Sequence, residues 1–136
     1  MIGLVIVLIV LGGATAFGLW RRRVDGRVVR PSAVVSGSTL GRAELGHDLG
    51  SRATLVQFSS AFCQPCRAAR ATLSHVAGTV PGVVHVEIDA ESHLDLVRRL
   101  EVMRTPTTFV LDPAGRVLHK ATGAPRLADV HAALPS

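Results

Sequence analysis

Aromatic residues and cysteines are scarce in this sequence. Its 136 residues include no tyrosine, one tryptophan, four phenylalanines and only two cysteines. Five of its fifteen basic side chains crowd residues 21–30, so little excess charge of either sign is left beyond that segment. With a near-neutral domain and few aromatic side chains, the chain is not expected to bind nucleic acid. No internal repeat or low-complexity segment is present, and the length suits one domain.

The two cysteines stand close together, in Cys63-Gln64-Pro65-Cys66. They follow the apolar run 53–58 and begin the segment that continues through 67–73, which predicts a strand-to-helix junction at the pair. The positive end of a helix and its free N–H groups stabilise a thiolate there, so the first cysteine becomes a nucleophile. The second thiol, one turn on, can close the ring and expel a partner's sulfur. Pro65 suits this first turn, where an N–H group has no helical partner.

Two other uses of a cysteine pair fit this pattern less well. A structural disulfide between such close neighbours closes a small loop and adds little stability. A closed zinc site needs four ligands, and no two of the six histidines have the His-x₃₋₅-His spacing that would help to supply them. The pattern therefore favours a dithiol–disulfide couple over a metal site or an inert pair, and no metal is expected.

The N-terminal segment is apolar over a length that suits a membrane. Ile2 to Trp20 contains no charged side chain, and a helix of this length spans about 28 Å, close to the hydrocarbon thickness of a bilayer. Trp20 and Arg21–Arg23 then provide an aromatic and cationic anchor at the headgroup level. The sequence predicts one transmembrane helix with its basic anchor over residues 1–23, with residues 2–23 in contact with membrane lipid.

A cleaved signal peptide is the alternative for this segment, because Ala14-Thr15-Ala16 resembles a cleavage site. Against it, no basic residue precedes the apolar run, and the arginines that follow would resist translocation. The positive-inside rule places these arginines, and the domain after them, on the cytoplasmic face. An extracytoplasmic domain is the other arrangement, and only the charge asymmetry argues against it.

The rest of the chain divides into a linker and a domain. Residues 24–38 have no sustained period and are expected to form a flexible linker to a domain at residues 39–136. After a weak signal near Leu40–Leu45, periodicity and turn residues predict the order β-α-β-α-β-β-α. These elements cover residues 54–58, 63–76, 83–89, 91 or 92 to 100, 107–111, 116–122 and 125–134. In the second helix, Leu94, Val97 and Leu100 are expected to face the core. The predicted fold class is α/β, a mixed four-stranded sheet with helices on both faces.

Further motifs surround and follow the cysteine pair. They are Phe62–Arg67 around the pair itself, Val86–Asp89 on the next strand, Thr105-Pro106-Thr107, and Gly115 and Gly123 at later turns. A lone CxxC is a weak signal, but a Thr-Pro-Thr before an apolar strand makes it a strong one. With these residues the chain, from about Ala53 to Leu134, resembles the thioredoxin family, and the resemblance implies a thioredoxin-like fold.

The resemblance also implies a protein-disulfide oxidoreductase whose only redox group is the Cys63–Cys66 disulfide, with no other cofactor. Cys63 resembles the attacking thiolate and Cys66 the resolving thiol. Pro106 resembles the cis-proline set against the disulfide, where the backbone of Thr105 pairs with substrate; an edge-strand proline is the alternative. Gly123 resembles a glycine beside the substrate groove, with a plain turn as the alternative. The implied partners are disulfide-bearing protein substrates and an upstream electron donor such as a thioredoxin reductase.

Several residues depart from the family pattern. Phe62 replaces a tryptophan and keeps an apolar rim, and Gln64 replaces a glycine between the cysteines, where the dipeptide tunes the redox potential. Gln57 replaces a buried aspartate that helps to deprotonate the resolving thiol, and an amide cannot accept that proton. His85 replaces a neighbouring lysine and is a candidate substitute, with a hydrogen-bonded or solvent-facing histidine as the alternative. The residues expected to shape the substrate site are Phe62, Gln64, Pro65, Thr105, Pro106 and Gly123, and the candidate tuning residues are Gln57, His85 and Arg67.

Two classes of function fit these features. The first is a membrane-tethered thiol–disulfide oxidoreductase, which on the cytoplasmic face, where thiols are kept reduced, would reduce protein disulfides. An extracytoplasmic variant would serve oxidative folding or cytochrome c maturation. The second class is a binding module, in which the cysteine pair holds a metal or the fold serves as an adaptor. This second class predicts no insulin-type reductase activity.

Overall fold

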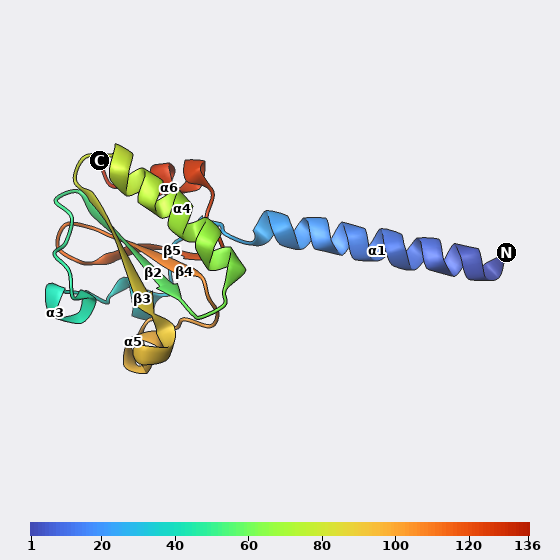
Figure 1. The fold of residues 1–136 in the computed structure, drawn as a ribbon, viewed down its shortest axis with the longest axis horizontal. Coiled ribbons are helices and arrows are strands. Elements are labelled where there is room, and N and C mark those ends of the chain that lie inside the picture. Colours follow the sequence, from blue (N-terminus) through green and yellow to red (C-terminus); the bar gives the residue numbers. More distant parts are fainter.

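Apolar runs separated by turns give the chain a five-stranded sheet, reached from a long N-terminal helix (Figure 1). The computed structural model describes residues 1–136. The helices are α1 (Ile2–Val24), α2 (Ala33–Ser36), α3 (Arg42–Leu45), α4 (Gln64–Thr79), the 3₁₀ turn η1 (Ala90–Ser92), α5 (Leu94–Arg99) and α6 (Leu127–Ala133). The strands are β1 (Val28–Val29), β2 (Ala53–Ser59), β3 (Val83–Asp89), β4 (Thr107–Leu111) and β5 (Val117–Thr122). The predicted order of elements after residue 53 is confirmed, and the weak signal at Leu40–Leu45 corresponds to α3.

The sheet has the order β1-β5-β4-β2-β3 and contains both kinds of strand pairing. β2 is parallel to β3 and antiparallel to β4, and β4 is antiparallel to β5. Parallel neighbours need a crossover connection, and α4 provides it between β2 and β3. Every residue of β2 is buried, as expected for a strand covered on both faces. The mixed sheet predicted from the sequence is confirmed.

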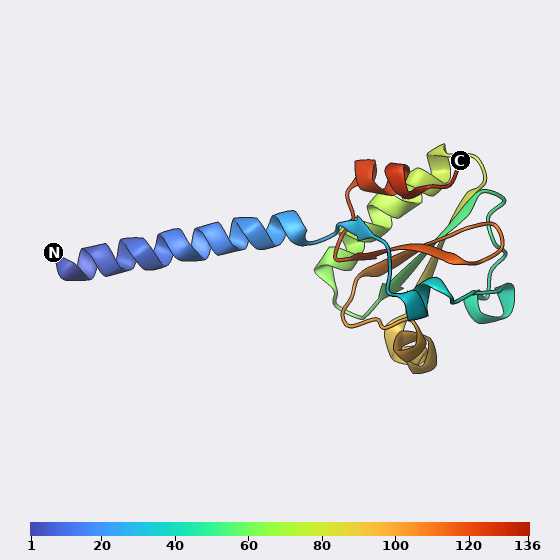
Figure 2. The ribbon, with the colours of Figure 1, turned by 180° about the vertical axis from the view of Figure 1, so that it is seen from behind.

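Helices cover both faces of this sheet (Figure 2). On one face α4 and α6 enclose an apolar cluster that includes Leu55, Leu73 and Val130. On the other face α5 and the short helices α2 and α3 cover a larger cluster, in which the rings of Phe58 and Phe109 meet edge to face at 5.8 Å. Alternate residues of β2 therefore serve two separate halves of the core.

The expected flexible linker at residues 24–38 is wrong, because this segment is packed against the domain. β1 pairs with β5, with Val28 opposite Ala121 and Val29 opposite Lys120, so the sheet has five strands and not the expected four. Val35 of α2 is fully buried in the larger apolar cluster. Two β-branched residues complete an otherwise open sheet edge, which orders a segment whose composition is typical of a loop.

The second predicted helix begins later than expected, and its first apolar residue does not face the core. The side chain of Asp89 accepts a hydrogen bond from the Glu91 N–H at 3.1 Å and caps η1, and α5 starts only after this turn. Leu94 is consequently 55 % exposed, whereas Leu96 is buried. Leu100 is buried and Val97 packs against the larger apolar cluster, as expected, so the prediction is wrong for Leu94 alone.

The N-terminal helix α1 stands clear of the domain over most of its length (Figure 1). It is the one helix that is long and apolar enough to cross a membrane, and none of its residues is buried in the protein. A membrane anchor and a signal sequence share these properties. Three arginines form its last turn, and Asp25 caps it by donating its backbone N–H to the carbonyl of Arg21 at 2.9 Å.

Candidate functional site

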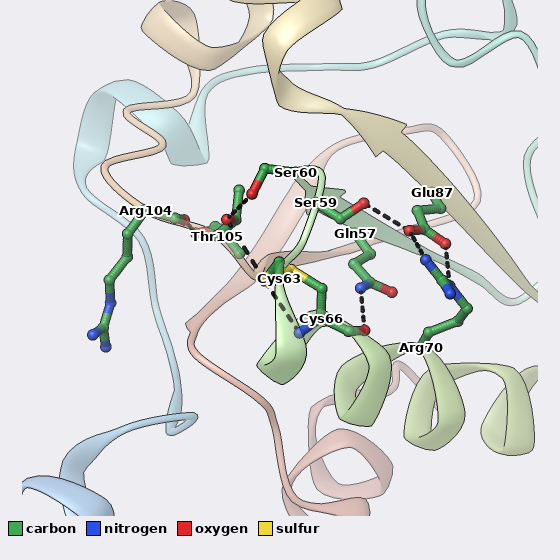
Figure 3. The surroundings of a disulfide bond; sticks show 10 residues. Gln57, Ser59, Ser60, Cys63, Cys66, Arg70, Glu87, Arg104 and Thr105 are labelled. Carbon is green, nitrogen blue, oxygen red and sulfur yellow. Dashed lines mark hydrogen bonds and ion pairs between the residues drawn. A yellow bond between two sulfur atoms is a disulfide. The ribbon is translucent and has the colours of Figure 1, made fainter.

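The two cysteines form a disulfide at the N-terminal end of α4, directly after β2 (Figure 3). Cys63 is the N-cap residue, and its sulfur accepts a hydrogen bond from the Cys66 N–H at 3.3 Å. Pro65 lies in the first turn, as expected. Cys63 is partly exposed, whereas Cys66 is only 2 % exposed. When the disulfide is reduced, the free N–H groups of this helix end can stabilise a thiolate on Cys63.

The loop that precedes β4 lies beside the disulfide. The Thr105–Pro106 peptide bond is cis, which confirms the expected isomer. The hydroxyl of Thr105 lies 3.8 Å from the Cys63 sulfur and 2.8 Å from the hydroxyl of Ser60. Gly123, at a φ of +93°, donates its N–H to the Pro106 carbonyl at 2.8 Å. The structure thus brings three of the predicted site-shaping residues together, and it adds Ser60, which carries no motif of its own.

The rim of the site is exposed and partly apolar. Phe62 has a φ of +58°, in the left-handed region, and its side chain projects fully into solvent immediately before the disulfide. Gln64 is also exposed at the start of α4. Arg67 is exposed one turn further on and takes part in none of the ion pairs of the structure. The structure therefore places Phe62 and Gln64 at the opening, whereas it shows no contact through which Arg67 would act on the sulfurs.

A chain of hydrogen bonds runs from beneath Cys66 to the surface of the protein. The amide nitrogen of Gln57, which is fully buried, donates to the Cys66 carbonyl at 2.9 Å (Figure 3). The amide oxygen of Gln57 lies 3.0 Å from Nε2 of His85, and Nδ1 of His85 lies 3.1 Å from the hydroxyl of Ser74. These contacts are all satisfied when neutral His85 carries its proton on Nε2 and accepts from Ser74. His85 is thus hydrogen-bonded, the second of the two arrangements considered for it.

The charges near this chain of hydrogen bonds are held to one side of it. Burial lowers the pKa of His85, the Glu87 carboxylate partly offsets that effect, and the Arg70 guanidinium lowers the pKa further. Arg70 donates twice to Glu87, at 2.6 Å each, and Ser59 donates to the same carboxylate at 2.6 Å. The hydrogen bonds from Arg70 are the main cause of the lowered pKa of Glu87. The ion pair therefore lies beside this chain of hydrogen bonds, since Glu87 is the strand partner of Gln57 and His85 is the partner of Leu55.

No group of three or more histidine, cysteine or acidic side chains in the structure is arranged to hold a metal ion. The chemistry that the site offers is that of its two sulfurs, one accessible and one buried, with a helix end and a proline loop around them.

The lowered pKa of His85 predicts a pH-dependent stability. In the unfolded chain His85 has the ordinary pKa of histidine, about 6.5, whereas in the folded protein its pKa is lower. At pH values between these two, the unfolded chain binds a proton that the folded chain does not. The contribution of His85 to the free energy of unfolding is therefore expected to be fully present above about pH 6.5 and to decrease as the pH is lowered from there through the lower pKa of the folded protein. Urea unfolding followed by circular dichroism should show a smaller decrease in His85→Asn, with the remainder due in part to His119, whose pKa burial also lowers.

His75→Asn is the control for that measurement, because His75 is exposed to solvent on α4. It is expected to leave the pH dependence of the wild-type chain unchanged. An identical decrease in stability for His85→Asn and the wild type would contradict the assignment.

Comparison with known proteins gives a consistent family. The model of the family described as Thioredoxin matches residues 42–135. A thioredoxin of Ophiophagus hannah is 31 % identical over 91 residues, which are 67 % of this chain and 85 % of that protein.

Solved thioredoxin structures share the fold. Thioredoxin f from spinach chloroplast has a TM-score of 0.54 at 23 % identity, over 62 % of this chain and 78 % of that one. Mitochondrial thioredoxin 3 from Saccharomyces cerevisiae, in its oxidized form, has a TM-score of 0.53 at 22 % identity, over 60 % and 76 % of the two chains. At these identities the similarity shows a shared fold and nothing further.

Family membership also decides between the two classes of function that the sequence allowed, in favour of the enzyme. The disulfide at the start of α4, the cis-proline loop and the matched family model agree with one another. The chain belongs to the thioredoxin family, and it is a protein-disulfide oxidoreductase whose active site contains the Cys63–Cys66 disulfide.

Proposed function

We propose that this protein is a membrane-anchored oxidoreductase that reduces disulfides in protein substrates, with Cys63 as nucleophile and Cys66 as resolving thiol. The observation that carries these roles is the unequal exposure of the two sulfurs at one helix end: Cys63 is accessible, whereas Cys66 is buried. Only an accessible thiolate can attack a disulfide in another protein. The buried thiol next to it then releases that protein by attacking the mixed disulfide from within the same molecule.

The reaction follows from these positions. The Cys63 thiolate attacks one sulfur of the substrate disulfide, and the other substrate sulfur leaves as a thiolate that takes up a proton. The Cys66 thiolate then attacks the Cys63 sulfur, which releases the second substrate thiol and leaves the Cys63–Cys66 disulfide. Two electrons have passed to the substrate. A dithiol donor, such as a thioredoxin reductase, returns them.

The substrate is proposed to lie across the opening between α4 and the proline loop. Phe62 and Gln64 form the exposed rim on one side, and Thr105 and Gly123 lie on the other. The Thr105 hydroxyl already contacts the Cys63 sulfur, so a substrate chain that pairs with the Thr105 backbone would have its own sulfur within reach. Pro65 limits the first helical turn to one conformation and so fixes the spacing of the cysteines.

The membrane anchor in this proposal is residues 1–23, ahead of the domain that residues 39–136 form together with the packed segment 24–38. The length and composition of α1 support it, together with the tryptophan and arginines that end the helix at the level expected of lipid headgroups. The same arginines favour the cytoplasmic face for the domain. There the surrounding thiols are kept reduced, which favours reduction of substrates over their oxidation.

Serine substitutions test the roles of the cysteines. Cys63→Ser is expected to abolish reduction of insulin, because no accessible nucleophile is left. Cys66→Ser is expected to retain the first attack and to accumulate mixed disulfides with partner proteins, visible on non-reducing gels. Accumulation in Cys63→Ser instead would reverse the assigned roles.

Sidedness can be read from the accessibility of the reduced cysteines. In intact cells treated with a permeant reductant, a membrane-impermeant maleimide is expected to spare the native protein and to label it only after permeabilisation. Moving Arg21, Arg22 and Arg23 to the N-terminal flank of α1 is expected to invert the protein, so that it is labelled in intact cells. Labelling of the native protein in sealed cells would instead place the domain outside, with a role in oxidative folding or cytochrome c maturation.

Gln57 contacts the Cys66 carbonyl but cannot serve as a base for its thiol, because an amide does not accept a proton. Gln57→Asp is therefore expected to speed release of the mixed disulfide by Cys66 about tenfold, which corresponds to about 1.4 kcal/mol of barrier. It is also expected to destabilise the fold by about 1–3 kcal/mol, because the two hydrogen bonds of the Gln57 amide are lost and a carboxyl group is buried.

Gln57→Asn is the matched control, since it has the same length as Gln57→Asp but cannot accept a proton. Stopped-flow measurement of partner release between about pH 6 and 9 separates the two variants. Equal rates and pH profiles for both would show that His85 or water already serves as the base.

A further inference from the structure

The end of the membrane helix forms one wall of a pocket beside the disulfide. This pocket has a volume of about 470 Å³. Arg22 and Asp25 line it from the end of α1, opposite Pro65 and Ala68 of α4, with Arg104–Pro106 and Gly123–Ala124 completing it. Figures 1 and 2 show the same proximity from opposite sides, with the last turn of α1 next to the first turn of α4.

Almost no chain separates the helix from the sheet. α1 ends at Val24, and two residues later the N–H of Gly26 donates to the carbonyl of Thr122, at the end of β5, at 2.7 Å. β1 then continues the pairing with β5. The domain is therefore held directly at the end of α1, without the slack that a flexible linker would give.

Two glycines make this close contact possible. Gly26 has a φ of +78°, and a Cβ atom there would lie 2.0 Å from the carbonyl oxygen of Ala124. Gly123 faces it, and a Cβ atom on Gly123 would lie 3.0 Å from the nitrogen of Gly26. Only a residue without a side chain fits at Gly26. The backbone of the juxtamembrane segment, residues 25–27, is thus packed against the turn that also supports Pro106.

An ion pair links the same segment to the proline loop. The guanidinium of Arg104 binds the carboxylate of Asp25, and Arg104 directly precedes Thr105, whose hydroxyl contacts the Cys63 sulfur. Arg22, on the membrane side of the pocket, takes part in no ion pair. The pocket therefore keeps one free cationic group on the side where the helix enters the bilayer.

These contacts place the active site at the height of the lipid headgroups. Arg22 belongs to the basic anchor of α1, and it lines the same pocket as Pro65, between the two cysteines. We infer that the substrate is a second membrane protein whose disulfide lies within a few residues of its own transmembrane segment, on the same side of the membrane. The inference rests on the proposed function, namely anchoring by α1 and reduction through Cys63.

A partner of this kind suits the surroundings of the pocket. A cysteine just outside a transmembrane segment is carried at headgroup height and approaches in the plane of the membrane, where the pocket opens beside α1. A disulfide on a long flexible tail spends little time at that height, so its effective concentration at the site is low. The positive wall at Arg22 further favours a partner segment with an acidic side chain beside its cysteine.

The test uses the full chain, reduced and freed of reductant, in vesicles that also hold a model transmembrane peptide. The peptide carries one cysteine, bonded as a mixed disulfide to a chromogenic thiol. Cys63 attacks the peptide sulfur and the chromogenic thiol leaves, after which Cys66 displaces the peptide thiol, so one dithiol is oxidised for each peptide disulfide reduced. In one peptide the cysteine lies about two residues beyond the helix. In the other it lies about fifteen flexible residues beyond, a mean reach of about 20 Å.

The wild-type chain is expected to react at least about tenfold faster with the near cysteine than with the far one, because effective concentration falls steeply with the length of a flexible tether. The matched variant carries about sixteen Gly and Ser residues inserted between Val24 and Asp25, which leaves α1, the Asp25–Arg104 ion pair and the cysteines unchanged. In this variant the preference is expected to fall to about threefold or less. Reduction of cystine, small enough to reach either site, is expected to be equal in both proteins.

Two results would overturn the inference while leaving the proposed function intact. One is a wild-type chain that reduces the near and far cysteines at equal rates. The other is an insertion variant that keeps the full wild-type preference. Failure of the proposed function itself is seen separately, as release of the chain from vesicles by alkaline carbonate or as loss of cystine reduction, and either of these overturns the inference with it.

Discussion

The complete burial of β2 is the constraint on which the site depends. Helices cover both faces of this strand, so its side chains are enclosed along its whole length. The chain reaches the surface only where β2 ends, and there it turns into α4 with Cys63 at the start of the helix. The antiparallel register sets Phe58 opposite Thr107, so β4 begins level with the end of β2. The residues before β4, Thr105 and Pro106, are thereby brought against the cysteines. One strand register thus assembles the two halves of the active site.

Beneath the sulfurs the protein uses a neutral amide where its family has a carboxylate. Gln57 uses its donor on the Cys66 carbonyl and its acceptor on His85, so no buried polar atom of this residue is left without a partner. A buried carboxylate would be costly to ionise in the same place. The charged pair of the region, Arg70 and Glu87, lies nearer to solvent instead. The groups that contact the cysteine pair from below are therefore neutral hydrogen-bonding groups.

Local patterns predicted the central part of this structure, and long-range contacts account for most of what they missed. The cysteine pair and the cis-proline loop follow from short motifs, and the strands from runs of apolar residues. The pairing of β1 with β5 joins segments far apart in sequence, and two valines carry too little signal to predict it. The Asp25–Arg104 ion pair and the contact from Ser60 to Thr105 are equally non-local. The exposure of Leu94 was missed because a capped 3₁₀ turn delays the start of α5.

The error about the linker has the largest consequence for function. A flexible tether of the expected length would let the active site search a shell of about 20 Å around its anchor, in every orientation. The observed contacts at Gly26 and Gly123 remove that freedom and fix which side of the domain faces the end of α1. Exposed ion pairs contribute little stability, so Asp25 and Arg104 serve to position the proline loop more than to hold the domain. The backbone packing at Gly26 and Gly123 brings the end of α1 to the pocket beside the active site, and at Gly26 no residue with a side chain would fit.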